Sequence, residues 1–292
     1  MRNISNSEVT TWLACRRMYW FAFFRNLAPK KLSRPLTRGT IGHDVFSKYV
    51  EFRLQGFAHT PALNGAFKYL SDTYMGVADL DIVLEVKFLI TRYMDTHKGW
   101  PEWELLGTEE RLDLRLSEEL NMTIRYDLLV KDRKTGRIYI VDFKFTYDFW
   151  YQRDHDLNGQ MPKYIAVMRA NGHDIYGGYI EEIRTRPLGK EKASVQKNLW
   201  RRTTYMPSKT MMRSMLKQHI SSAMEIEEYW SGDDAFRDAK SIPVLNKHGA
   251  CKYCNFASVC NSWNDGGDVE TMLSLDYEPN TYGYNEENVD EP

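Results

Sequence analysis

An aspartate and a lysine stand close together in an otherwise apolar stretch, where their charges could hold a cation and act on a bound substrate. Asp142 and Lys144 are two positions apart in "IYIVDFKF", residues 138–145. In a β-strand such residues point to the same side, roughly 7 Å apart at the backbone. Buried charges without partners cost several kcal/mol. The alternate residues can enter the core: Tyr139, Val141, Phe143 and Phe145.

A second carboxylate is predicted to face Asp142 from the preceding strand. The turn-rich "DRKTG" joins two strands, and a hairpin centred between Lys134 and Thr135 pairs residues whose numbers sum to 269. Asp127 then lies opposite Asp142. Like charges repel there unless a cation lies between them, and Mg²⁺ or Mn²⁺ takes oxygen ligands. The pattern favours a metal with a substrate phosphate; the alternative is a cross-strand salt bridge on a solvated sheet face.

Further polar positions are candidates for the same site. Gln160 and Tyr164 in "GQMPKYIAVM" have i, i+4 spacing, which places them on one face of a helix. His43 follows a glycine near the start of another predicted helix, in "RGTIGHDVF". Each of these is, taken alone, an ordinary structural residue. Glu109 or Glu110 could add a carboxylate, and the sequence does not choose between them.

Hydrophobic periodicity predicts the elements that position these side chains. Helical spacing covers residues 5–24, 40–55, 62–96, 155–170 and 208–230, the first of them with a capping box at Ser5 and Glu8. Alternation predicts a meander of strands at 104–116, 121–132 and 137–145, and another strand at 173–182. The pattern predicts an α/β fold, with a small mixed sheet flanked by helices.

Taken in chain order, the candidate residues resemble the RecB-type motifs of the PD-(D/E)XK nuclease superfamily. The resemblance covers roughly residues 37–170 and consists of His43 after Gly42, Asp127, Asp142-Phe143-Lys144 and Gln160-x3-Tyr164. It implies a restriction-endonuclease-like core and metal-dependent hydrolysis of DNA phosphodiesters.

The resemblance also implies a role for each residue. Asp127 and Asp142 would hold Mg²⁺ or Mn²⁺, joined by His43 and the backbone carbonyl of Phe143. Lys144 would orient or help to deprotonate the attacking water and would offset charge in the transition state. The remaining pair would position the lysine or the DNA backbone: Gln160 and Tyr164.

The cysteines have the spacing of metal ligands. Cys251, Cys254 and Cys260 form a C-x2-C-x5-C cluster, and the fourth, Cys15, lies in the first predicted helix. The arrangement is similar to that of iron-sulfur nucleases of the same superfamily, including the AddB nuclease domain and the CRISPR-associated RecB-like exonucleases. That similarity implies a 4Fe-4S cluster that clasps the two ends of the chain. Zinc and four unligated thiols are the alternatives.

Charge is distributed unevenly along the chain. Residues 264–292 carry nine acidic and no basic side chains, which leaves 39 basic against 31 acidic groups in the rest. A basic, aromatic segment at 184–217 is predicted to contact nucleic acid, although a solvated surface is the alternative. Its candidate contacts are Lys197, Trp200, Arg201, Arg202 and Tyr205. The acidic tail is predicted to be mobile.

Composition is that of an ordinary globular protein, with 42% hydrophobic and 27% charged residues. The run "MYWFAFF" is too short for a membrane span or secretory signal, so we expect a cytoplasmic protein. Four regions are predicted: an N-terminal clasp helix at 1–36, the nuclease core at 37–185, a basic helical region with the cysteine cluster at 186–263, and the acidic tail at 264–292.

The functional prediction is a metal-dependent deoxyribonuclease, favoured as a single-strand exonuclease in recombination, repair or CRISPR adaptation. The chain has no Walker-type phosphate loop, so unwinding would need a separate helicase. Two alternatives belong to other classes. One is a catalytically silent DNA-binding or assembly protein, and the other is a zinc-stabilised nucleic-acid-binding protein.

Overall fold

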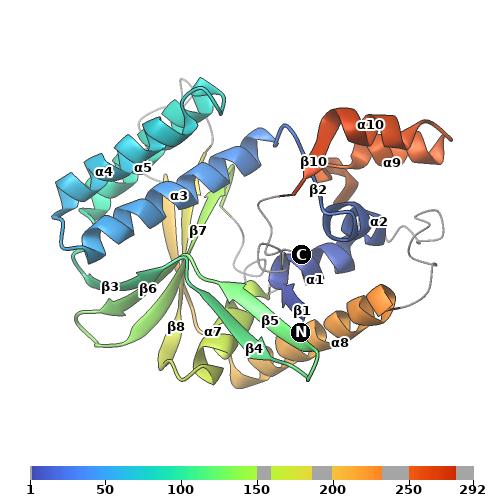
Figure 1. Cartoon of the computed structure of the whole chain (residues 1–292). Coiled ribbons are helices and arrows are strands. Elements are labelled where there is room, and N and C mark those ends of the chain that lie inside the picture. Colours follow the sequence, from blue (N-terminus) through green and yellow to red (C-terminus); the bar gives the residue numbers. More distant parts are fainter. Residues whose placement is uncertain (1, 150–158, 186–198, 232–249, 281–292) are drawn as a thin grey trace, which may run out of the picture. The chain divides into compact units, whose positions relative to one another are not determined.

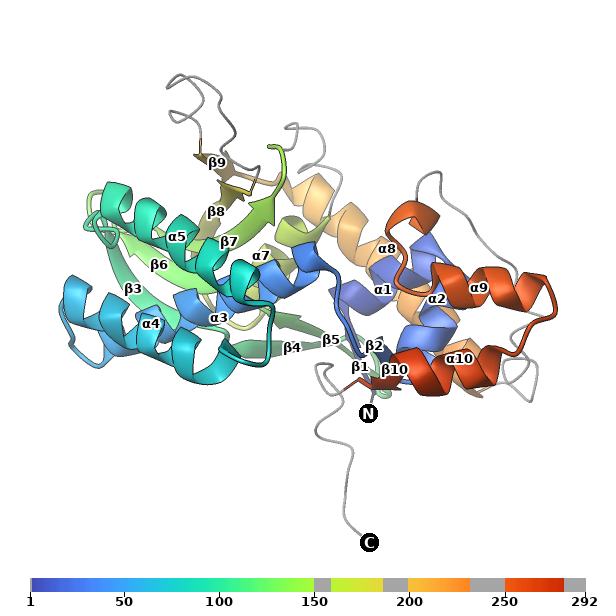
Figure 2. The same cartoon turned by 90° about the horizontal axis from the view of Figure 1, so that it is seen from above.

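The computed structural model describes residues 2–149, 159–185, 199–231 and 250–280. The chain forms two compact units, each built from separate stretches of sequence (Figures 1 and 2). The sheet unit contains Arg34–Leu112 and Ile124–Met215, and the terminal unit contains Met1–Ser33, Asp113–Thr123 and Leu216–Pro292. Within the described ranges, no helix combines the length and apolar character needed to cross a bilayer.

A mixed five-stranded sheet forms the middle of the sheet unit. Its strands, in spatial order, are β3 (Trp103–Thr108), β6 (Leu128–Asp132), β7 (Ile138–Thr146), β8 (Ile175–Arg184) and β9 (Trp200–Tyr205). All neighbours are antiparallel except β7 and β8, which are parallel. Parallel neighbours need a crossover, and α7 (Gln160–Ala170) provides it. The predicted small mixed sheet is confirmed.

The β6–β7 hairpin confirms the predicted register. Leu128 pairs with Val141 and Lys131 with Ile138, so the numbers of the partners sum to 269. The turn residues and the alternating pattern were enough to fix this pairing, because a slip by one residue would turn the apolar side chains out of the core.

Helices cover both faces of the sheet (Figure 1). On one face lie α3 (Arg34–Leu54), α4 (His59–Tyr74) and α5 (Leu80–His97), and the ring of Phe143 stacks on Phe46 of α3 with centroids 4.3 Å apart. On the other face α7 packs against β8, where a Cβ on Gly178 would lie 2.4 Å from Met161 Sδ. The alternation along β7 thus buries its apolar residues under α3 and turns Asp142 and Lys144 toward α7.

The first two predicted strands are each divided in two. Residues 104–116 form β3 and β4 (Arg111–Arg115), and Glu109 between them has a left-handed backbone with φ of 51°. Residues 121–132 form β5 (Leu120–Arg125) and β6. Because β4 and β5 leave the five-stranded sheet to join β1 (Arg2–Ser5) in a second one, Glu109 and Asp127 lie at the points where the chain changes sheet.

The terminal unit brings together segments from both ends of the chain. Its elements include β1, α1 (Asn6–Ala14), α2 (Arg16–Tyr19), a π-helical turn (Trp20–Phe24), β2 (Leu27–Pro29), the C-terminal part of α8 (Lys209–Ser231), a 3-10 turn (Ala250–Tyr253), α9 (Ala257–Asn264), α10 (Val269–Asp276) and β10 (Tyr277–Pro279). The strand β10 pairs antiparallel with β2. Aromatic residues dominate its core.

The predicted helix at 5–24 is interrupted. Ser5 caps it as expected, accepting a hydrogen bond from the Glu8 N–H at 3.0 Å. The helix ends at Ala14, however, and Cys15 is extended. The guanidinium of Arg16 donates to the carbonyl of Trp12. In a continuing helix this carbonyl would accept from a backbone N–H, so the side chain takes the place of that helical hydrogen bond. Cys15 is therefore a helix-ending residue and not a helical one.

The acidic tail differs from the mobile segment expected at 264–292. Asp268 caps α10 by accepting from the Thr271 N–H at 3.0 Å, and Glu270 pairs with Arg25. Pairing of β10 with β2 then fixes the chain as far as Pro279. Residues 281–292 lie outside the described part of the chain. Two of the tail's acids therefore serve as a local cap and an ion-pair partner, which the net charge did not reveal.

Candidate active site

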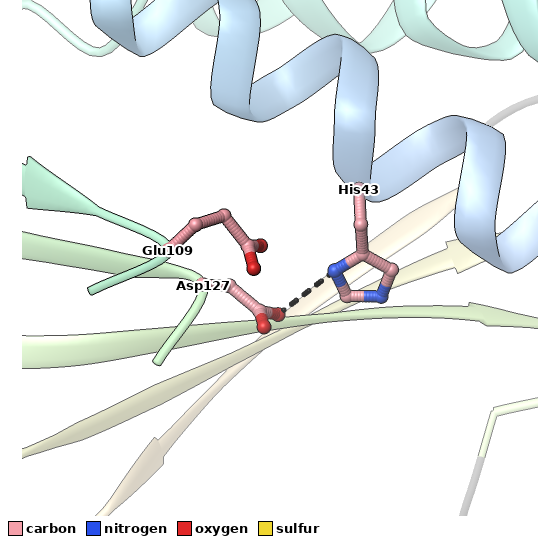
Figure 3. A group of neighbouring side chains, drawn as sticks. All are labelled: His43, Glu109 and Asp127. Carbon is pink, nitrogen blue, oxygen red and sulfur yellow. Dashed lines mark ion pairs between the residues drawn. The ribbon is translucent and has the colours of Figure 1, made fainter. Parts of the chain in front are cut away.

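Three side chains from different elements converge at one end of the sheet (Figure 3). His43 comes from α3, Glu109 from the connection after β3, and Asp127 from the residue before β6. Each offers a ligand atom, and these three atoms all lie within 4.8 Å of one another. The Nδ1 of His43 is 3.2 Å from Oδ2 of Asp127. We call this group the triad.

The backbone holds the triad in place. The Phe143 N–H donates to Asp127 Oδ2 at 2.8 Å, and the Thr108 hydroxyl donates to the Asp127 carbonyl at 2.7 Å. Before His43, a Cβ on Gly42 would lie 2.2 Å from the ring of Phe145. A larger residue at this position would require the Phe145 ring to move, so the glycine allows α3 to pack directly against this side chain of β7.

A second group adjoins the triad. Lys144 Nζ lies 3.0 Å from Oδ1 and 2.9 Å from Oδ2 of Asp142. Gln160, the first residue of α7, donates from Nε2 to Asp142 Oδ1 at 3.0 Å and accepts from Lys144 at 3.2 Å. Asp142 is only 5% exposed. The buried aspartate thus has the charged and hydrogen-bonding partners that burial requires.

The two groups are coupled electrostatically. Burial raises the pKa of Glu109 to about 7, and repulsion from Asp127 adds to the shift. Burial also opposes the charge of Asp127, but His43 and Lys144 hold its pKa below the ordinary value. The pKa of Asp142 is raised by burial and by Asp127, against the attraction of Lys144. Glu109, Asp127 and Asp142 therefore lie in one site, which opposes the simultaneous ionisation of all three carboxylates.

The donor set fits a divalent cation. Carboxylate oxygens suit Mg²⁺ and Mn²⁺, and an imidazole nitrogen suits the transition ions better than Mg²⁺. Because the pKa of Glu109 is raised to about 7, this carboxylate is protonated in part near neutral pH, which relieves part of the repulsion. A cation bound by the triad would take the place of that proton.

Comparison with known proteins places the chain in a family. A profile of the PD-(D/E)XK nuclease superfamily matches residues 3–261. The chain belongs to this superfamily. The fold is similar to that of a candidate exonuclease from Eubacterium rectale, with a TM-score of 0.51 and 11% identity over 88% of this chain and 87% of that one. The structure of SSO0001 gives a TM-score of 0.39 and 10% identity over 89% and 86% of the two chains. No curated protein matches the sequence.

Membership of the PD-(D/E)XK nuclease superfamily supports a nuclease that acts on nucleic acid with a divalent metal. At 11% identity the E. rectale structure shows a shared fold. The family therefore agrees with the chemistry that the triad and its neighbours suggest.

The structure places the predicted site residues of this superfamily member as follows. His43 and Asp127 lie in the triad, while Asp142, Lys144 and Gln160 form the adjoining group. Tyr164 is buried one turn further along α7.

The structure also shows that Glu109 and Glu110 have different partners. The carboxylate of Glu110 accepts from the Tyr126 hydroxyl, away from the triad, whereas Glu109 belongs to it. The sequence left this choice open because it depends on where the strand breaks.

The predicted DNA contacts of 184–217 are largely engaged within the sheet. Arg201 pairs with Glu182 at 2.5 Å, and Arg202 pairs with Glu102 at 2.9 Å and with Glu181. Tyr205 is buried and Trp200 packs beside the main core, while Lys197 lies outside the described residues. The paired arginines thus balance buried glutamates of β8.

The four cysteines gather in the terminal unit. Burial raises the pKa of the Cys254 thiol, and its neighbours Cys15, Cys251 and Cys260 raise it further. Arg17, a buried residue, donates to Cys260 Sγ at 3.2 Å. Cys254 packs against a hydrophobic cluster that includes a stack of Phe21, Phe256 and Tyr277. Thiols from distant parts of the sequence thus lie in one unit, where Cys15, Cys254 and Cys260 are half-buried and Cys251 is exposed.

Proposed function

We propose that the protein is a divalent-metal-dependent deoxyribonuclease that degrades single-stranded DNA from an end. One observation carries the proposal: the triad meets the Asp142–Lys144–Gln160 group where Asp127 and Asp142 repel each other. Family membership supports hydrolysis of nucleic acid, and the similar fold of the E. rectale candidate exonuclease supports action at strand ends.

Metal binding is assigned to the triad together with Asp142 and the backbone carbonyl of Phe143. The Phe143 N–H points at Asp127, and the N–H and C=O of one strand residue point to the same side. A bound ion would supply an activated water and positive charge for the scissile phosphate. Because the set includes His43, we expect Mn²⁺ to bind more tightly than Mg²⁺.

Lys144 is assigned to the attacking water. Burial opposes its charge, but Asp142 and Asp127 outweigh that effect and raise the pKa of the ammonium above its ordinary value. A protonated amine can orient water and offset charge in the transition state. Gln160 holds Lys144 and Asp142 together, and Tyr164 is assigned a supporting contact with this group or with the DNA backbone.

Metal removal tests the nuclease directly. Full-length protein is incubated with single- and double-stranded DNA labelled at either end, in Mn²⁺, Mg²⁺ or EDTA. We expect progressive shortening of single strands in Mn²⁺, slower shortening in Mg²⁺, and a loss of at least about 100-fold in EDTA that added Mn²⁺ reverses. Cleavage that persists in EDTA would refute the metal assignment, and absence of cleavage with both ions would refute the nuclease.

We also assign a structural 4Fe-4S cluster to the four cysteines, which would place the chain in the RecB-like iron-sulfur branch. Four thiols and a guanidinium donating to one sulfur fit an anionic cluster, since a cation that donates to a thiolate ligand stabilises its negative charge. In this branch the protein would act in recombination, repair or CRISPR spacer acquisition, in the cytoplasm, beside a helicase or adaptation partner.

Metal analysis decides between iron and zinc. Protein purified without oxygen should be brown and contain about four iron and four sulfide per chain. A colourless preparation with one zinc per chain would replace the cluster by a zinc site without affecting the triad. Chelation of the triad metal provides the control, because it should leave the colour unchanged.

A further inference from the structure

Lys163 is a buried lysine that the proposed reaction does not use. It lies in α7, and only 5% of it is exposed. Its side chain makes no hydrogen bond or ion pair within the part of the chain that the structure describes. Burial alone lowers the pKa of its ammonium to about 8. Proteins seldom bury an unpaired lysine, because its charge loses hydration without compensation.

The ammonium of Lys163 is directed at the N-terminus of α7. Side chains of a helix lean toward its start, and Nζ lies 3.8 Å from the place that a Cβ of Gly159 would occupy. The Sδ of Met215 borders the same place at 3.0 Å. Gly159 is the N-cap, with a left-handed backbone at φ 72°, no side-chain cap and no acidic residue in the following turn. The positive end of the helix dipole and the ammonium therefore point to the same spot.

The ammonium keeps limited contact with solvent and lies beside the candidate active site. Nζ is not among the fully enclosed unpaired atoms of the described residues, so solvent still reaches it. One turn earlier in the same helix, Gln160 bonds both Asp142 and Lys144. An anion held by Lys163 would therefore be a near neighbour of a phosphate bound at the metal.

We propose that Lys163 and the N-terminus of α7 bind a phosphate of the nucleic-acid strand next to the phosphodiester that is cleaved. The nature of the strand rests on the proposed function, but the anion site itself does not. Two sources share this chemistry: a terminal phosphate and an internal phosphodiester. In either case, binding energy at this second phosphate would hold the scissile one in place.

Inorganic phosphate tests the anion site without any cleavage. Thermal unfolding of the metal-free, full-length protein is measured with and without phosphate for the wild type, Lys163→Met, and Lys68→Met, an exposed lysine of α4 as the matched control. Phosphate should raise the Tm of the wild type and of the control by a few degrees, and should leave Lys163→Met unchanged. An equal shift in all three proteins would overturn the proposal.

The same variant separates an anion site from a structural lysine. Met keeps the buried methylene chain and removes the uncompensated charge, so Lys163→Met should melt above the wild type without phosphate. A Tm below that of the wild type would assign Lys163 to the architecture of α7 and would contradict the proposal.

Oligonucleotides distinguish the two phosphate sources. Affinity is measured in Ca²⁺ for single strands bearing a 5′-phosphate, a 3′-phosphate or hydroxyls at both ends. Lys163→Met should weaken binding about tenfold, for every strand if the phosphate is internal and only for the matching end if it is terminal. Unchanged affinity for all strands would overturn the site. A phosphate effect in a protein that cleaves no nucleic acid would keep the site and refute the nuclease.

Discussion

Replacing Lys144 with alanine should reduce cleavage of single-stranded DNA by about 10²- to 10⁴-fold while DNA binding persists. The ammonium lies within 3.0 Å of Asp142 and is the positive group nearest to this carboxylate in the described structure. It is placed to meet water and phosphate oxygens, so its loss removes stabilisation that is strongest in the transition state. Single-turnover cleavage of labelled DNA in saturating Mn²⁺ measures the loss.

A lysine of the same sheet serves as the control. Lys131 lies on β6 opposite Ile138, at the other end of the hairpin pairing, and Lys131→Ala should cleave at nearly the wild-type rate. Lys144→Ala should also gain more Tm from Mn²⁺ than the wild type does, because Asp127 and Asp142 then lack a cation until the metal binds. Cleavage by Lys144→Ala within threefold of the wild type would remove this lysine from the mechanism.

The parts of this site that follow from local rules could be predicted from the sequence. The β6–β7 register depended only on the turn and on the alternation of apolar residues, both of which are local. The same alternation placed Asp142 and Lys144 together. Helical spacing predicted a helix over residues 155–170 that carries Gln160 and Tyr164, and the helix of the structure begins at Gln160.

The remaining features depend on where the chain changes sheet, which no local pattern encodes. Glu109 joins the triad because the backbone turns left-handed there, and neither neighbour is a glycine or proline that would have signalled a break. The alternation of apolar and polar residues therefore predicted one strand over residues 104–116. The pairing of β10 with β2 could not be predicted either. A three-residue strand in an acidic segment is too short to show an alternation of apolar and polar residues.

The sequence does not single out Lys163, because its local pattern is ordinary. The sequence around it is helical, and a lysine in a helix is normally solvated. Only the structure shows that this one turns inward toward Gly159 and has no partner among the described residues. Lys163 stands between Pro162 and Tyr164, which are both buried on the same helix. This position was the one sequence feature that could have indicated its burial.

Replacing Cys254 with serine should remove the cluster and destabilise the terminal unit far more than the sheet unit. Cys254 is half-buried and is the thiol that the other three influence. The chain segments that carry the four cysteines come from opposite ends of the sequence, so a shared metal centre closes a long loop. Because binding of such a centre is coupled to folding, its loss should cost several kcal/mol and lower the Tm by roughly 10 °C.

Hydrogen exchange can locate that loss within the molecule. In Cys254→Ser, amides of α1 and α9 should exchange much faster, while those of the β6–β7 hairpin should keep their protection, because the triad and its supports belong to the other unit. Asn261→Ala, an exposed neighbour of Cys260 on α9, should change neither. Uniform loss of protection in both units would mean that they fold as one, and unchanged protection everywhere would mean that the thiols bind no structural centre. Either result would leave the phosphate and Lys144 predictions intact, because their residues lie in the sheet unit.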